Sequence, residues 1–178
     1  GYIRLRRSGE LRLKLKQTDK KHIELFKKCI ESTHPIKDSV SIVKYSDNKI
    51  SKSKSSYISI NNTKIVRDLI KLGCVNAKSF IIKLLKLKHD LIRHFIRGYF
   101  DGDGCIYISK NNSGTFNITS GSKQMIDDIN NVFRSNHIIK CHTKITKNTY
   151  RLNIYDKAEL LKIYNYLYDN STIYLNRK

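Results

Sequence analysis

The feature of this sequence that most constrains its fold is an internal repeat. Sliding the chain against itself by 103 positions places Gly104 on Gly1 without a gap. Apolar positions then coincide while polar positions differ, which is typical of two copies of one folding unit. The coinciding pairs include Ile106 with Ile3, Ile108 with Leu5, Phe116 with Leu13, Ile118 with Leu15, Ile126 with Ile23, and Val132 with Cys29. We therefore predict two halves, residues 1–88 and residues 89–178.

Each half has the pattern of a mixed helix and strand unit. In the second half, Asp90 is a predicted N-cap, strands alternate apolar and polar residues around the turn NNSG, and the middle helix gathers its apolar residues on one face. The predicted elements are a helix over 91–101, strands over 105–110 and 115–120, a helix over 122–136, strands over 138–145 and 150–155, and a helix over 156–168. The order is αββαββα, so the predicted fold class is α+β.

The first half repeats this order without the leading helix. Its predicted elements are strands over 2–7 and 11–17, a helix over 19–32, strands over 39–45 and 56–61, and a helix over 63–72 closed by Gly73. The segment SDNKISKSKSS, residues 46–56, is basic and poor in apolar residues, so it is predicted to be a loop. Binding to phosphate is a compatible role for such a loop.

Strand alternation predicts which side chains point away from the core. The inward set is Ile3, Leu5, Leu13, Leu15, Ile139, Cys141, Ile145, Leu152 and Ile154. The outward set is Arg4, Arg6, Arg12, Lys14 and Lys16 in the first half, and Lys140, His142, Lys144, Arg151, Asn153 and Tyr155 in the second. One sheet face is thus predicted to be a basic and polar surface, on which a solvated face would ordinarily mix both signs of charge.

The charge balance identifies the kind of partner. The 178 residues include 35 Lys and Arg against 15 Asp and Glu, a net charge of +20, which favours a polyanion. Basic strands suit the major groove of duplex DNA, whereas aromatic residues, at 10%, are too scattered for a single-strand stacking platform. We therefore predict binding to double-stranded DNA.

Several other classes are disfavoured. No apolar run approaches the roughly 20 residues of a membrane span, and no signal peptide is present, so we predict a soluble, intracellular protein without membrane partners. The four cysteines form no CxxC pair, which argues against a disulfide framework or a zinc ribbon. His137, Cys141 and His142 lack the second ligand pair that a zinc site needs.

Acidic residues stand out on so basic a chain. Residues 95–106 read FIRGYFDGDGCI. Asp103 is predicted just past the helix end, where a bound Mg²⁺ would lie between the carboxylate and a DNA phosphate. Asp101 is predicted to bond neighbouring backbone groups at the turn. Gly98 and Gly102, four residues apart, would allow a second helix to approach closely. The alternative is that DGDG is an ordinary helix-to-strand turn.

The segment IRGYFDGDG, residues 96–104, resembles the LAGLIDADG motif, with Gly98, Asp101, Asp103 and Gly104 in their expected places. The αββαββα order, the repeat and the closing YDNSTIYLNRK resemble the two-repeat LAGLIDADG homing endonucleases over nearly the whole chain. The resemblance implies antiparallel, saddle-shaped sheets on duplex DNA, and a site-specific, Mg²⁺-dependent double-strand endonuclease of the homing type. Such enzymes are associated with intron or intein mobility, and the sequence leaves open a free-standing, intron-encoded or intein-embedded protein.

Individual roles follow from this resemblance. It implies that Asp103 is the metal-binding catalytic acid, that the carbonyl of Gly102 is a second metal contact, and that Lys78 lies near the active-site water, with Arg177 or Lys178 as its counterpart. Arg97 departs from the usual Ala, which a phosphate contact or solvent exposure would explain.

The offset of 103 places the first copy's acid one residue before Gly1. The leading helix is therefore expected either earlier in a longer, pseudo-dimeric chain or from another polypeptide. Alternatively, the protein is a non-cleaving binder on the same scaffold, such as an RNA maturase or a transcription regulator.

Overall fold

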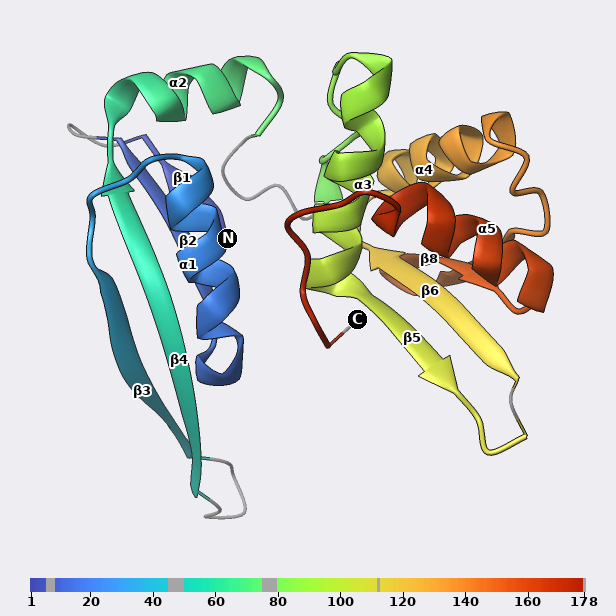
Figure 1. The fold of residues 1–178 in the computed structure, drawn as a ribbon, viewed down its shortest axis with the longest axis horizontal. Helices are drawn as coiled ribbons and strands as arrows, with labels where there is room; N and C mark the ends of the chain where they lie inside the picture. Colours follow the sequence, from blue (N-terminus) through green and yellow to red (C-terminus); the bar gives the residue numbers. More distant parts are fainter. Residues whose placement is uncertain (6–8, 45–49, 75–79, 112, 178) are drawn as a thin grey trace. The chain divides into compact units, whose positions relative to one another are not determined.

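The chain folds into two compact units, Gly1–Asn76 and Ala77–Lys178 (Figure 1). The computed structural model describes residues 1–5, 9–44, 50–74, 80–111 and 113–177. The predicted boundary between residues 88 and 89 concerns the sequence repeat and stays a prediction. None of the helices in the described ranges is both long and apolar enough to cross a membrane.

The first unit is a four-stranded antiparallel sheet with helices against it. Its elements are β1 (Tyr2–Arg4), β2 (Glu10–Lys16), the short 3-10 helix η1 (Gln17–Asp19), α1 (Lys20–Cys29), β3 (Ile36–Lys44), β4 (Ile50–Asn61) and α2 (Thr63–Lys71). The strand order is β1-β2-β4-β3. Asn62 caps α2 by accepting from the backbone N–H of Ile65 at 3.0 Å, and Gly73, at φ 101°, follows the helix end as predicted.

The second unit repeats this arrangement behind an additional helix. Its elements are α3 (His89–Asp103), β5 (Gly104–Ile108), β6 (Gly114–Ser120), α4 (Lys123–Ser135), β7 (His142–Thr146), β8 (Thr149–Ile154) and α5 (Lys157–Tyr168). The strand order, β5-β6-β8-β7, is that of the first sheet. The predicted α+β class and the duplicated arrangement are confirmed.

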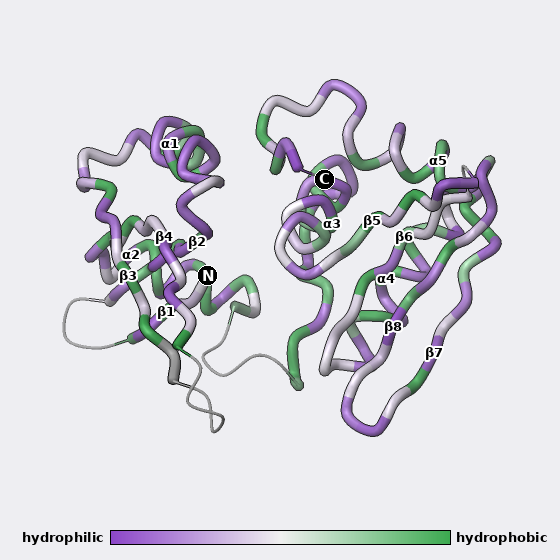
Figure 2. Tube along the Cα trace, turned by 90° about the horizontal axis from the view of Figure 1, so that it is seen from below, coloured by the Kyte–Doolittle hydropathy of each residue, from purple (hydrophilic) through white to green (hydrophobic). Residues whose placement is uncertain are grey.

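The helices of each unit cover the apolar face of its sheet. Hydrophobic and hydrophilic residues alternate along strands such as β8 (Figure 2). In the second unit, Phe100 of α3 stacks on Phe116 of β6 with ring centroids 4.3 Å apart, and both are fully buried. The core of the first unit is smaller and centres on Ile23, Ile58 and Ile60.

Three predictions about residues at element ends are wrong. Leu5 was expected to face the core, but it lies beyond β1 and is 57% exposed. Asp90 does not cap α3, because the helix already begins at His89 and places Asp90 in its first turn, where a carboxylate still favours the helix dipole. The same helix continues through Asp103, so this acid is helical rather than just beyond the helix.

The predicted loop over residues 46–56 is largely a strand. Residues 45–49 lie outside the described ranges, but β4 already begins at Ile50, and its register pairs Lys52 with Ile42 and Lys54 with Val40 of β3. Backbone pairing between two strands needs no buried side chains, so the low apolar content was a poor guide. The result is a long ribbon whose outer end carries exposed lysines.

The predicted strand over residues 138–145 is shorter than expected. Its first four residues are not strand, and β7 begins at His142. His137 has φ 61°, which turns the chain after α4 and sends Ile138, rather than Ile139, into the core. Ile139 is 59% exposed, so its predicted inward position is wrong. Cys141 is half-buried and packs against the core, as predicted.

Ile145 has the predicted face but not the predicted burial. It pairs with Tyr150, on the same face of the sheet as Leu152. It is nevertheless 65% exposed, because β7 is the edge strand of its sheet. Alternation therefore identified the face, while burial depends on what covers it.

Candidate nucleic-acid interface and acidic helix end

The outer face of the first sheet carries basic residues from β1 and β2. Strand pairing places Arg12 beside Ser59, Lys14 beside Tyr57 and Lys16 beside Ser55, and paired residues of antiparallel strands share a face. Arg4 lies on the same face, because its partner on β2 is Glu10. The described outer face of this unit includes Tyr2, Arg4, Glu10, Arg12, Lys14, Lys16, Lys37, Ser39, Ser41, Ser51, Ser53, Ser55, Tyr57, Ser59 and Asn61.

Arg12 is held in place at the centre of this face. Its Nη2 lies 2.7 Å from Oε1 of Glu10, and its Nε donates to Oγ of Ser59 at 2.6 Å. The guanidinium also lies 4.9 Å from the ring centroid of Tyr57 and 5.6 Å from that of Tyr2. Partial burial opposes ionisation of Glu10, but the hydrogen bond from Ser59 and the charge of Arg12 outweigh it and lower the pKa of the carboxyl. This site therefore presents an ordered, planar cation flanked by aromatic rings.

Lys16 borders an open hollow of about 450 Å³ on the first unit. The hollow is lined by Lys16, Gln17, Thr18, Lys52, Ser53 and Lys54. Its lysines come from β2 and from the β4 segment predicted to be a loop. Three lysines around one hollow favour phosphate groups.

The outer face of the second sheet is built in the same way. Pairing places His142 beside Asn153 and Lys144 beside Arg151, so the predicted outward set of these strands does share a face. Nε of Arg151 donates to Oγ1 of Thr119 at 3.1 Å. Asn153 is buried, at 6% exposure, whereas His142, Lys144 and Arg151 are exposed.

Two predicted contact residues lie at the ends of these strands. Tyr155 follows β8, is 55% exposed, and its ring centroid lies 5.9 Å from that of His142. Lys140 precedes β7, and its Nζ contacts Oδ2 of Asp156 at 2.5 Å. The hydrogen bond and charge of Lys140 lower the pKa of Asp156, so this lysine is already engaged by a carboxylate.

The two acids at the end of α3 have opposite environments. Asp101 is 3% exposed; its Oδ1 accepts from Oη of Tyr168 at 2.7 Å and its Oδ2 from the N–H of Leu175 at 2.9 Å. Its partners are thus 67 and 74 residues away, not the neighbouring turn groups that the sequence predicted. Asp103, the last residue of the helix, is exposed.

Asp103 is the acid of this pair that can reach a ligand. It takes part in none of the ion pairs found in the part of the chain that the structure describes. Burial raises the pKa of nearby Tyr99, and the negative charge of Asp103 adds to this rise although a hydrogen bond with Ser120 opposes it. The carboxylate of Asp103 is thus exposed to solvent.

The donor set at this helix end fits Mg²⁺ only in part. Among the described residues, no group of three or more His, Cys, Asp or Glu side chains converges on one point. Mg²⁺ commonly takes one or two carboxylates and fills its remaining positions with water and phosphate oxygens. An exposed Asp103 beside the backbone carbonyl of Gly102 suits that kind of shared site.

Arg97 is not in the environment that the sequence predicted. It is 5% exposed and does not face solvent or a phosphate. Its guanidinium donates to the carbonyls of Leu167 and Ile173, at 3.0 Å each, and contacts Nδ1 of His94 at 2.7 Å. The departure from the usual Ala at this position of the motif was the signal for such a role. Three further predicted residues, Arg6, Lys78 and Lys178, lie outside the described ranges.

Comparisons with known proteins agree with the fold described above. Residues 90–168 match the family described as LAGLIDADG-like domain. A comparison with curated protein sequences finds no significant match. Among solved structures, the homing endonuclease I-WcaI bound to its DNA recognition sequence is similar, with 14% identity and a TM-score of 0.64 over 94% of this chain and 75% of that one.

Two further structures share the fold. The N-terminal LAGLIDADG domain of DUF199/WhiA has 12% identity and a TM-score of 0.55 over 97% of this chain and 77% of that one. A variant of I-DmoI, in complex with its target DNA in the presence of 2 mM Mg, has 11% identity and a TM-score of 0.52 over 96% and 88%. Residues 90–168 are therefore a LAGLIDADG-like domain, in a chain built on the scaffold that homing endonucleases and DUF199/WhiA share.

Proposed function

We propose that this protein is a site-specific endonuclease of the homing type, which hydrolyses phosphodiesters of duplex DNA with the help of a divalent cation. The observation that carries the proposal is the contrast at the end of α3. Asp101 is buried and bonded on both oxygens, whereas Asp103, two residues on, is exposed. An exposed carboxylate weakens DNA binding by repelling phosphate, so its position at this helix end is best explained by a cation bound there.

The basic outer faces would hold the duplex. Arg and Lys neutralise phosphates, and Arg and Asn side chains can read base edges in the major groove. On this proposal the repeats, residues 1–88 and 89–178, each contact one half of the target, as in a pseudo-dimer. The DNA complexes of I-WcaI and of the I-DmoI variant support this choice of partner.

The catalytic step would depend on a few groups of this chain. Asp103, with the carbonyl of Gly102, would hold Mg²⁺, and Lys78 would lie near the attacking water. When bound, such a cation activates water and stabilises the leaving oxygen. The contribution of Asp103 is to fix the position of the cation against one strand.

The proposal is tested with the full chain on a randomised duplex library. The chain is incubated with the library and Mg²⁺, and new ends are captured and sequenced. Wild type is expected to give one enriched cut site. Asp103→Asn should lower the cleavage rate by at least about 10²–10³-fold, while duplex affinity stays equal or rises because one negative charge is lost.

Asp127→Asn is the matched control, because it removes an exposed carboxylate from α4 in the same unit. It should cleave like wild type. Cleavage by Asp103→Asn at the wild-type rate, or loss of cleavage in both variants alike, would contradict the proposal.

A non-cleaving binder, such as an RNA maturase or a transcription regulator, is the second candidate. It is favoured by the same fold in DUF199/WhiA. Such a protein would bind duplexes of the library, or RNA supplied separately, without producing new ends, and Asp103→Asn would bind at least as tightly as wild type.

A further inference from the structure

One face of α3 is tied to the segment that follows α5. Arg93, Arg97 and Asp101 are four residues apart and therefore lie on one side of the helix. All three bond groups between Leu167 and Leu175. We call residues 169–175 the closing segment.

Arg97 is the centre of these contacts. Its two carbonyl partners lie before and within the closing segment: Leu167 is in the last turn of α5, where carbonyls lack helical partners, and Ile173 is six residues later. Arg93 adds a 3.3 Å bond from Nη1 to the carbonyl of Asp169. Burial lowers the pKa of His94, and the charges of Arg97 and Arg93 lower it further. A neutral His94 can accept a hydrogen bond from Arg97 at Nδ1, so His94 adds a third acceptor to the two backbone carbonyls that bind this guanidinium.

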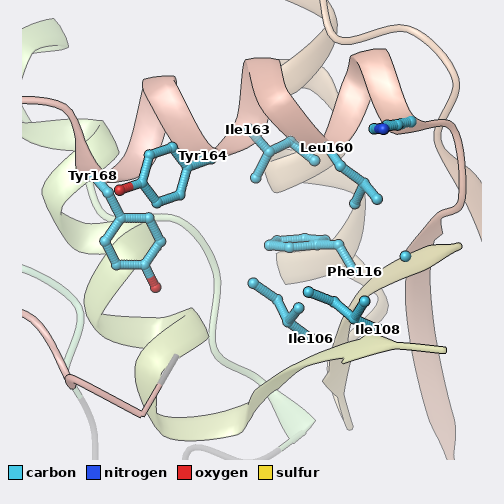
Figure 3. Close-up of a pocket in the computed structure, with 9 residues that line it drawn as sticks. Ile106, Ile108, Phe116, Leu160, Ile163, Tyr164 and Tyr168 are labelled. Carbon is cyan, nitrogen blue, oxygen red and sulfur yellow. The ribbon is translucent and has the colours of Figure 1, made fainter. Parts of the chain in front are cut away.

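Asp101 ties the last turn of the helix to the same segment. Tyr168 lies at the α3 end of an apolar pocket of about 210 Å³ between α5 and the β5-β6 hairpin, with its ring turned from α5 toward α3 (Figure 3). Burial raises the pKa of Tyr168 and the bond to Asp101 raises it further, so the hydroxyl stays protonated and donates. Leu175, 4% exposed, donates its backbone N–H to the other oxygen.

The helix end is held from two sides. Where α3 ends, the chain passes directly into β5, whose first residue, Gly104, pairs with Ile118 of β6. Gly102 separates Asp101 from Asp103, and a Cβ built at Gly102 would meet nothing within 4 Å. Glycine also loosens a helix relative to alanine. On the other side, Gly104 packs so closely against Phe100 that an added Cβ would lie 2.0 Å from its Cδ2. The last turn is thus held by Phe100 and Asp101, and Asp103 extends from it without packing of its own.

We propose that Asp101 and Arg97 are positioning residues, which use the closing segment to fix the end of α3 and thereby the carboxylate of Asp103. This inference rests on the proposed nuclease function and deepens it. Displacing a reacting group by about 1 Å can cost about 10²-fold in rate. Loss of these contacts should therefore slow cleavage without weakening duplex binding, which depends on the sheet faces.

The test compares Asp101→Ala, Asp101→Asn and Arg97→Ala with wild type on the duplex selected above. Single-turnover cleavage rate, duplex Kd and hydrogen exchange of the Leu175 amide are measured in each full-length variant. Asp101→Ala should slow cleavage about 10²-fold, leave Kd unchanged and speed exchange at Leu175. Asp101→Asn keeps a side-chain oxygen that can accept from the N–H of Leu175, and its NH2 group can donate to the hydroxyl oxygen of Tyr168. It should therefore keep most of the wild-type cleavage rate.

Asp127→Ala controls for loss of a carboxylate elsewhere in the second unit. The inference is overturned if Asp101→Ala cleaves like wild type, if exchange at Leu175 does not change, or if Asp101→Asn is as slow as Asp101→Ala, because charge rather than position would then matter. If Asp101→Ala is unfolded, Tyr168→Phe decides: a slower rate at equal Kd supports positioning, and an unchanged rate refutes it. A wild type that does not cleave refutes the nuclease function itself, whereas the outcomes above refute positioning alone.

Discussion

The two units share one strand order but bury very different amounts of apolar surface. Of the buried apolar side chains in the described residues, five belong to the first unit and fifteen to the second. The second unit has α3 and its stacked phenylalanines, whereas in the described part of the first unit α1 and α2 are the α-helices against the sheet. Since burial of apolar surface is the main favourable term in folding, equal topology here does not mean equal stability.

The first unit instead has a long two-stranded ribbon formed by β3 and β4. Its β3 and β4 have 9 and 12 residues, whereas the equivalent β7 and β8 have 5 and 6. The outer part of the ribbon exposes Val40, Ile42 and Ile50, each by about 60%. The first unit is therefore the better candidate for stabilisation by a bound polyanion, and the second for an independently stable core.

The strongest test of this difference is to truncate one core residue in each unit. Phe133→Ala removes a fully buried ring that meets Phe116 and Tyr166 edge-on and should cost the second unit about 3–5 kcal/mol. Ile23→Ala should cost about 2–5 kcal/mol, which is enough to unfold a unit with so small a core. Urea unfolding followed by hydrogen exchange assigns each loss to its unit.

Leu25→Ala is the control for Ile23→Ala, because it lies on the same helix and is 41% exposed. It should change stability by less than about 0.5 kcal/mol. If Ile23→Ala also removed protection from the second-unit strands, the two units would share one cooperative core and the comparison would fail.

A smaller effect is expected from duplex DNA. A duplex present at 100 times its Kd should stabilise the bound state by about 2.7 kcal/mol, and amides of β2 and β4 should then exchange up to about 100-fold more slowly. In 0.5 M salt this protection should vanish, since phosphate contacts are screened and counterions compete. Protection confined to the second unit would show that the first does not depend on its ligand.

The sequence predicted those parts of the structure that depend on local periodicity. The repeat gave two units of one topology, and alternation placed Arg12, Lys14 and Arg151 on outer faces because each strand has only two faces. It was wrong where burial depends on distant partners: Ile139 and Ile145 are apolar and exposed, since nothing in the local pattern states which elements will cover them.

The candidate site was predictable to a similar extent. From their positions in DGDG, Asp101 was predicted to bond protein groups and Asp103 to face a ligand, which agrees with the burial of Asp101 and the exposure of Asp103. The partners of Asp101 could not be predicted, because Tyr168 and Leu175 reach it only after α5 has packed. Arg97 shows the same limit, since its carbonyl partners belong to backbone 70 and 76 residues away.

The smallest expected effect tests whether the two units differ in stability because of their cores or because of their surface charges. Each unit carries one matched helical ion pair, Lys64 with Asp68 on α2 and Lys123 with Asp127 on α4, both exposed and four residues apart. Exposed pairs of this kind contribute little. Lys64→Ala and Lys123→Ala should each shift the urea midpoint by about a tenth or less of the shift caused by Phe133→Ala.

The first of these pairs also has a defined pH dependence. The hydrogen bond and charge of Lys64 lower the pKa of Asp68. Any stability from this pair is therefore present above the unfolded pKa, about 3.9, and is lost as the pH falls through the lowered folded value. Lys64→Ala and wild type should thus differ slightly at pH 7 and not at pH 2, in low salt. A midpoint shift as large as that of a core truncation, in one unit only, would mean that surface charge rather than core size distinguishes the two halves.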